Sequence, residues 1–240
     1  MTDPLFVYAS KVAPEAPKLL RIFGLHKNDG DGAIAHDAFT ECKGAAEKGS
    51  PFAMCLCSRL CLSGWGTQRS LESAFHWAKR AADAGYAPGH YELGKCYEQG
   101  IGVSKDLDVA RKEYEMAIEG GFAFAACHLA ELYHSTSFGE PDFATAIRYA
   151  KRGYELGDPL APYLVATWFE EGDGVIRNEK EAAVWYERAS ELGNYFASSR
   201  LCRAYRLGQL GLAKDSSLAK EYEQKCDSSL REAESDQSTK

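Results

Sequence analysis

Three cysteines that lie close together in the sequence are the first residues that could do chemistry. Cys55, Cys57 and Cys61 could supply thiolate ligands to a zinc ion. A tetrahedral site needs a fourth ligand, and no histidine follows them at ligand spacing. On a helix, Cys55 would also point to a different side from Cys57 and Cys61. Cys57 and Cys61, which occupy columns filled elsewhere by Leu and Tyr, are therefore predicted to be small core residues, and no metal is expected.

Other residues that could support catalysis are equally isolated. Glu170 and Glu171 could act as acid and base, but adjacent helical residues point about 100° apart and seldom share one substrate. The histidines are scattered, and none forms a metalloprotease motif or a nearby Cys/His pair. Gly-x-Gly segments lack the Lys and Ser/Thr of a phosphate-binding loop. We expect no enzymatic activity and no cofactor.

The elements that carry these residues repeat along the chain. Five glycines recur every 36 residues, at Gly49, Gly85, Gly121, Gly157 and Gly193. After each glycine, three positions at steps of four share one face of a predicted helix A. The second position holds Cys57, Leu93, Leu129, Val165 and Leu201, and the third holds Cys61, Tyr97, Tyr133, Phe169 and Tyr205. A helix B follows, with alanine at 74, 110, 146 and 182, and ends at the next glycine.

Glycine loops separate the two helices of three units. They contain Gly64 and Gly66, Gly100 and Gly102, and Gly172 and Gly174, where a sharp turn needs positive φ. The third unit has Ser137-Phe138-Gly139 instead, and the fifth has Gly208 and Gly211 at altered spacing. These two loops are expected to differ from the others.

The residues from Leu93-Gly94 to Gly102-Val103, and those from Gly172 to Ala189, resemble the Sel-one-like repeat family, a relative of the tetratricopeptide repeat. The resemblance implies an all-α superhelix, an α-solenoid of about five helix pairs. Some secreted members of this family carry one disulfide per repeat at fixed columns. The eight cysteines of this chain do not follow that plan, which favours a reduced compartment.

The repeat period also predicts the boundaries of the chain's parts. Residues 49–226 form the five repeats, and residues 1–48 form a degenerate N-terminal capping repeat whose helices cover 14–26 and 36–48. Residues 227–240 are polar and are expected to be a disordered tail. The start Met1-Thr-Asp-Pro has no signal-peptide pattern and no segment is apolar enough to span a membrane, so a cytoplasmic protein is expected.

Charge and helix geometry then predict a binding surface. The net charge of −7 and the lack of a Lys/Arg cluster disfavour nucleic acid and anionic membranes. In tetratricopeptide-like solenoids, helix A residues between the core columns line a concave groove. Tyr91 and Tyr163 are candidate anchors, or else they only cover neighbouring helices. The predicted partner-binding residues are Arg59, Tyr91, Lys95, Glu98, Glu131, His134, Tyr163, Thr167, Glu170, Glu171, Arg203 and Arg206.

The function expected from these features is non-catalytic binding. The protein is predicted to be an adaptor or scaffold that holds another protein or peptide in the groove. The resemblance leaves an inhibitor open as the alternative, because some bacterial members of the family are immunity proteins that block a toxin. Hydrolase activity, once proposed for some secreted relatives, is disfavoured because no nucleophile and base are paired in the sequence.

Overall fold

A computed structural model describes Leu5, Tyr8 and residues 32–238 of the 240-residue chain. Within these residues all regular structure is helical. The helices fall into two compact units, which we call unit 1 and unit 2; unit 1 ends at Phe122 and unit 2 begins at Ala123. The division therefore lies between the second and third repeats. The predicted capping helix at residues 14–26 lies outside the described residues.

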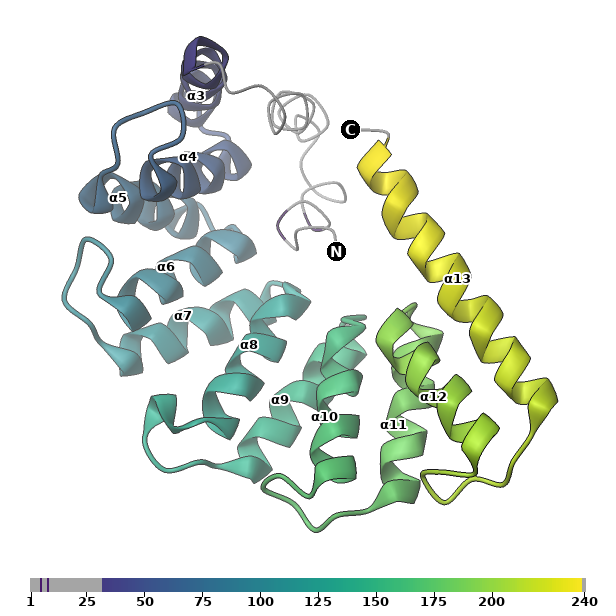
Figure 1. The fold of residues 1–240 in the computed structure, drawn as a ribbon. Helices are drawn as coiled ribbons and strands as arrows, with labels where there is room; N and C mark the ends of the chain where they lie inside the picture. Colours follow the sequence, from purple (N-terminus) through teal and green to yellow (C-terminus); the bar gives the residue numbers. More distant parts are fainter. Residues whose placement is uncertain (1–4, 6–7, 9–31, 239–240) are drawn as a thin grey trace. The chain divides into compact units, whose positions relative to one another are not determined.

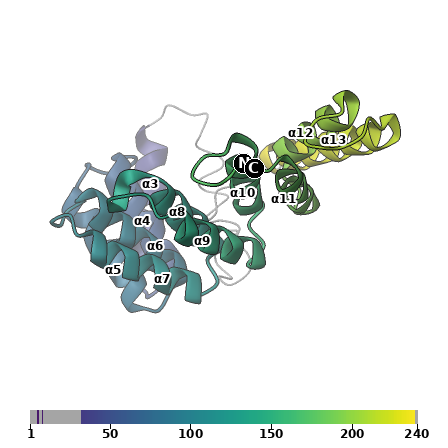
Figure 2. The same ribbon diagram turned by 90° about the horizontal axis from the view of Figure 1, so that it is seen from below.

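Unit 1 is a stack of antiparallel helices (Figure 1). Each helix packs against the next in sequence, and α4 also packs against α6, the next helix A (Figure 2). A helix occupies the region predicted for the second half of the N-terminal cap. The helices are α3 (Gly32–Glu47), α4 (Pro51–Ser63), α5 (Leu71–Asp83), α6 (Ala87–Gln99) and α7 (Leu107–Glu119).

Unit 2 is built in the same way. Its last helix continues past Cys226 to Ser238, so the helix does not end at the boundary predicted from the sequence. Helices α4, α6, α8, α10 and α12 are the A helices, and the helix after each is its B helix. The elements are α8 (Ala123–His134), the 3₁₀-helix η1 (Thr136–Phe138), α9 (Phe143–Glu155), α10 (Leu160–Glu171), α11 (Glu179–Glu191), α12 (Tyr195–Leu207) and α13 (Ser216–Ser238).

The repeat also fixes where each B helix begins. Ser70, Asp106, Asp142 and Asn178 recur at the 36-residue interval, and each side chain accepts a hydrogen bond from a backbone N–H of the first turn. Such caps satisfy donors that have no partner inside the helix. The backbone N–H of each cap residue donates in turn to the carbonyl of the third column position of helix A, as Asp106 does to Tyr97 at 2.9 Å. The divergent third and fifth loops close with the same bond.

The second glycine of each Gly-x-Gly loop is required by a close approach as well as by its backbone angle. Gly102 has φ of 66°, and a Cβ there would lie 2.3 Å from the carbonyl oxygen of Leu71, at the start of the preceding helix B. Gly66 meets Ala35 in the same way, 31 residues earlier in the chain. The loop glycines predicted from the sequence are thus confirmed.

The core follows the predicted columns. The alanines at 74, 110, 146 and 182 are at most 1% exposed, because two helices approach each other there. The apolar column of helix A is at most 5% exposed. Trp77 and Trp185 are buried as well, and the guanidinium groups of Arg80 and Arg188 lie 4.6 and 4.2 Å from their ring centroids. The all-α solenoid predicted from the period is confirmed.

Candidate partner-binding surface

The predicted site residues of unit 1 are held by contacts within the unit. Tyr91 is 8% exposed, and its ring packs against Tyr114 at 5.6 Å and Phe122 at 5.3 Å between centroids. Lys95 lies over the Tyr91 ring at 5.5 Å and pairs with the buried Glu92 at 3.2 Å. Tyr91 therefore covers neighbouring aromatic rings, which was the alternative to a role as an anchor.

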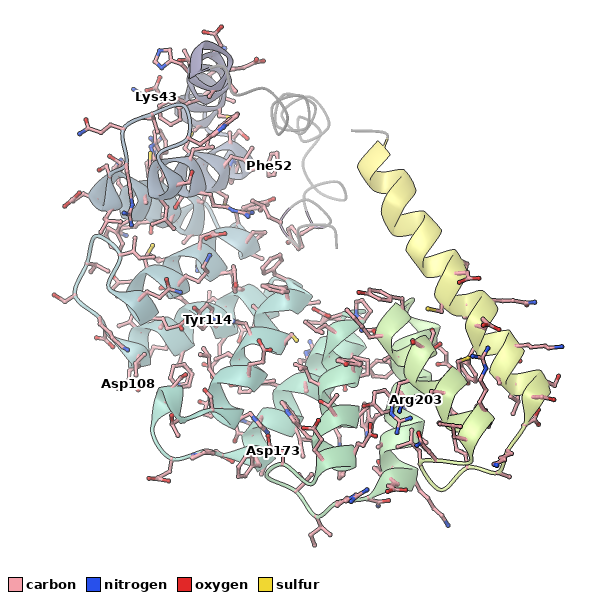
Figure 3. All side chains as sticks on the ribbon, viewed as in Figure 1. Lys43, Phe52, Asp108, Tyr114, Asp173 and Arg203 are labelled. Carbon is pink, nitrogen blue, oxygen red and sulfur yellow. The ribbon has the colours of Figure 1, made fainter. Side chains whose placement is uncertain are left out.

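The remaining two residues in unit 1 also have partners. Nε of Arg59 lies 4.0 Å from Oε1 of Glu92, so Arg59 and Lys95 flank one buried carboxylate. Glu98 accepts a 2.5 Å hydrogen bond from the hydroxyl of Tyr114, a residue buried between the helices (Figure 3). Burial and the Glu98 carboxylate both raise the pKa of Tyr114 well above its usual value, so this hydroxyl stays protonated and donates.

Unit 2 leaves more of its predicted residues accessible. On each A helix, the positions 3, 6, 10 and 14 residues after the period glycine lie on one face, which we call the A stripe. The A stripe of α10 carries Tyr163, half-buried, and Glu171, exposed. The A stripe of α12 consists of Phe196, Ser199, Arg203 and Leu207, all of which are exposed.

Aromatic contacts join these two stripes. The ring of Tyr163 lies 6.0 Å from that of Phe196, which is 44% exposed, and 5.8 Å from that of the buried Tyr186. Leu207 is 51% exposed on the same stripe as Phe196. Arg203 lies between them in sequence and projects from α12 (Figure 3). Unit 2 therefore presents apolar and cationic groups together on its A helices.

Glu170 belongs to a polar network beneath this surface. It accepts a 2.7 Å hydrogen bond from Tyr186 and bonds of 2.5 and 3.1 Å from the guanidinium of Arg200. Burial alone raises the pKa of Glu170, but the hydrogen bonds from Arg200 and Tyr186 outweigh it, and the net pKa lies below its usual value. Glu170 is thus an ionised group that holds α10 to α12.

The other predicted residues of unit 2 divide between structural and accessible positions. The His134 ring stacks on Trp168 with centroids 4.4 Å apart, and its Nε2 lies 3.4 Å from Asp173, so it joins helices. The Thr167 hydroxyl donates to the Leu164 carbonyl of its own helix. Glu131 is exposed, and Arg206 pairs with Glu223 of α13 at 2.6 Å.

Sequence reasoning missed three residues of these clusters. Phe196 lies on the A stripe of α12, as Tyr163 lies on the A stripe of α10, so the helical period could have indicated it. Glu92 and Arg200 occupy one column, seven residues after the period glycine, and both are charges flanked by an opposite charge. No sequence signal pairs Arg200 with Glu170, because the contact joins two repeats.

Cys57, Cys61, Cys96 and Cys202 are buried, as their columns predict, and Cys55, which helical spacing placed toward the groove, is buried as well. All eight are free thiols, and Cys55, Cys57 and Cys61 are 0%, 0% and 3% exposed. Burial raises the pKa of Cys42 and of Cys96 to about 12, which makes both poor nucleophiles. Among residues 32–238 no group of three or more His, Cys, Asp and Glu side chains is arranged to hold a metal ion.

The spacing of the helices matches a known repeat. The Sel1 repeat matches residues 51–86, 87–122, 123–158, 159–194 and 196–225, one helix pair in each. The chain belongs to the Sel1 repeat family. Each Sel1 repeat begins at the first turn of an A helix, so the boundary between units 1 and 2 coincides with a repeat boundary.

Similar proteins include regulators and other Sel1 repeat proteins. A chitin synthase regulator SKT5 from Malassezia restricta is 34% identical over 153 residues, which are 60% of this chain but 10% of that protein. The solved structure of a Sel1 repeat protein from Oxalobacter formigenes has 25% identity and a TM-score of 0.61, covering 88% of this chain and 82% of that one.

The immunity protein Pa5087 from Pseudomonas aeruginosa shares the fold, with 20% identity and a TM-score of 0.58 over 90% of this chain and 82% of that one. Sel1 repeat proteins bind other proteins as adaptors and regulators. No helix among the described residues has the length and apolar character to cross a membrane.

Proposed function

We propose that this Sel1 repeat protein is a non-catalytic adaptor that holds a partner protein or peptide on the A stripes of α10 and α12. The observation that carries the proposal is the exposure of Phe196 and Leu207, at 44% and 51%, on the same stripe as Arg203. Large apolar side chains in this setting are typical of interfaces, and aromatic and arginine residues dominate interface energies. Tyr163 extends the patch onto α10.

The polar network beneath the patch supports the same role. Arg200 and Tyr186 fix the Glu170 carboxylate, and Tyr186 in turn packs against the ring of Tyr163. A side chain already ordered in the free protein loses little entropy when a partner binds. The accessible charges differ by helix, with Glu171 on α10 and Arg203 on α12, so a partner with charges of both signs would fit.

An immunity function is the second candidate. The likeness to an immunity protein is one of fold, so what favours this function here is the acidic chain, with a net charge of −7. An acidic inhibitor associates rapidly with a basic toxin because opposite charges steer the encounter. The same A stripes would then cover the toxin instead of joining two proteins.

Affinity purification with matched variants tests both candidates. Tyr163→Ala with Phe196→Ala should lose a partner that the wild type retains, and the affinity of the purified partner should fall by about 2 kcal/mol or more, the scale of a hot spot. Val184→Ala, an exposed apolar change on helix B α11, serves as the control. Co-expression with the captured partner then separates the two roles. If the partner is a toxin that stops growth, only an immunity protein restores the growth of cells that produce it.

The A stripes would be refuted as the site if the Val184 control lost binding while the Tyr163 and Phe196 variant kept it.

A second comparison uses charge. Glu171→Lys should slow association with a basic partner, and the effect should shrink in high salt because surface charges act at long range. Lys112→Glu on α7, also exposed, should leave the association rate unchanged.

A further inference from the structure

Two residues near the N-terminus pack against helices of unit 1 that come much later in the sequence. Leu5 is 2% exposed and belongs to the core cluster that residues of α3 to α6 build. The ring of Tyr8 makes edge contacts with Tyr86 and Phe122, each at 5.7 Å between centroids. The Tyr8 hydroxyl donates a 2.9 Å hydrogen bond to the carbonyl of Gly120, 112 residues later.

The residues that receive Tyr8 depart from the repeat. Tyr86 and Phe122 occupy one column, 36 residues apart, where the first and fifth repeats have Ser50 and Asn194. Ser50 and Asn194 cap the helices α4 and α12, whereas Tyr86 makes no capping hydrogen bond. Two repeats have thus replaced a capping side chain by an aromatic ring. The two rings instead form the binding site of the Tyr8 ring, which we call the Tyr8 site.

The chemistry of the Tyr8 site determines which side chains can bind there. The backbone at Leu5 and Tyr8 is helical, and a spacing of three puts both side chains on the same side of a helix. The Tyr8 ring fits between Tyr86 and Phe122, and Phe122 in turn contacts the ring of Tyr91. A phenol is favoured over a phenyl group because Gly120, just beyond the end of α7, offers a carbonyl acceptor.

We propose that unit 1 is a receptor for a helical segment that carries an aliphatic residue three positions before a tyrosine, and that the chain's own Leu5 and Tyr8 occupy it as an intramolecular ligand. A tethered segment reaches an effective concentration in the millimolar range, so two side-chain contacts suffice to fill the site. A partner segment of the same pattern must displace it. This inference rests on the proposed function, because it supplies the class of partner that unit 1 would bind.

The test uses a labelled synthetic peptide of residues 1–12 and the purified full chain. In fluorescence anisotropy, the peptide should bind the double variant Leu5→Ser/Tyr8→Ser at least tenfold more tightly than the wild type, whose site is filled from its own tether. A peptide carrying the same two serines should bind neither protein. Equal affinity for the wild type and the variant, or no binding to a folded variant, would overturn the proposal.

Two further measurements keep the test decisive. Tyr8→Ser alone leaves Leu5 in the core, so it guards against unfolding of the double variant and should raise peptide affinity by a smaller factor. Sedimentation shows whether the wild type forms dimers that the double variant lacks, which would place the segment on a second copy and overturn the intramolecular assignment. The assay contains no partner. A negative result in the peptide assay therefore does not contradict the proposed function. That function is tested separately, by partner binding of the Tyr163 and Phe196 variant.

Discussion

Tyr186 donates a 2.7 Å hydrogen bond to Glu170, and Tyr114 donates the same bond to Glu98 two repeats earlier. The two pairs are 72 residues apart, and each joins helix B to the end of its helix A across 16 residues of sequence. Both hydroxyls belong to buried residues, since Tyr186 is 2% and Tyr114 is 0% exposed. The second and fourth repeats therefore share a polar clasp that the first and third, with Ala78 and Ala150 in this column, cannot form.

Removing the clasp should destabilise the protein. Tyr186→Phe deletes one hydroxyl and should lower the free energy of unfolding by about 1.5 to 3 kcal/mol, as for a hydrogen bond to a charged group. Urea denaturation measures this change. Glu171→Gln, an exposed change beside the Glu170 clasp, is the control and should stay within about 0.5 kcal/mol of the wild type. A Tyr186 effect as small as the control would mean that the bond contributes nothing.

The clasp also predicts a pH dependence. The folded pKa of Glu170 is lowered from its usual value of 4.5, so its ionised form stabilises the fold at higher pH. This contribution is complete above pH 4.5 and is lost as the pH falls through the lower folded pKa. Thermal melts should show a stability difference between the wild type and Glu170→Gln that is present at neutral pH and shrinks in acid. A difference that grows in acid would contradict the lowered pKa.

Close approach at the loop glycines can be separated from backbone strain. Gly102 and Gly85 have φ of 66° and 73°, so alanine is strained by a similar amount at both, about 1 to 2 kcal/mol. Only Gly102 faces the carbonyl of Leu71, and nothing lies within 4 Å of a Cβ at Gly85. Gly102→Ala should therefore cost clearly more stability than Gly85→Ala. Equal costs would show that the loop shifts to make room.

The thiols should be passive in the folded protein. Seven cysteines are buried and only Cys226 is partly exposed, so Ellman's reagent should react with one thiol first and with the others only on unfolding. Reducing agent and chelator should leave the melting temperature within about one degree, whereas loss of a disulfide would shift it by far more. Several fast thiols in the native state would contradict this packing.

Stability should decline along α13. Ala219 is buried and Tyr222 stacks on Tyr205, with centroids 5.7 Å apart, but Asp227 and Ser228 are exposed. Because a helix without packed neighbours opens easily, amide exchange should be fast beyond Cys226 and slowest between residues 85 and 193. Uniform protection to the end of α13 would mean that the boundary predicted at Cys226 is wrong.

The sequence by itself determined the repeat and the core. A 36-residue period of glycine, alanine and apolar columns can be satisfied only by stacked helix pairs, because every unit needs a neighbour to bury the same face. Gly85 at a helix end and Cys57 in the core were read correctly for this reason. The period also indicates which face of each helix A lies outside the core columns.

Only the tertiary structure decided how the residues on that face are used. Helical spacing places Tyr91 and Tyr163 in one column, but Tyr91 is buried against Phe122 while Tyr163 borders the exposed Phe196. Local sequence does not indicate such contact partners, because they come from other repeats. The same holds for Arg200 on Glu170 and for Tyr8 on Gly120, contacts over 30 and 112 residues that exist only once the helices are stacked.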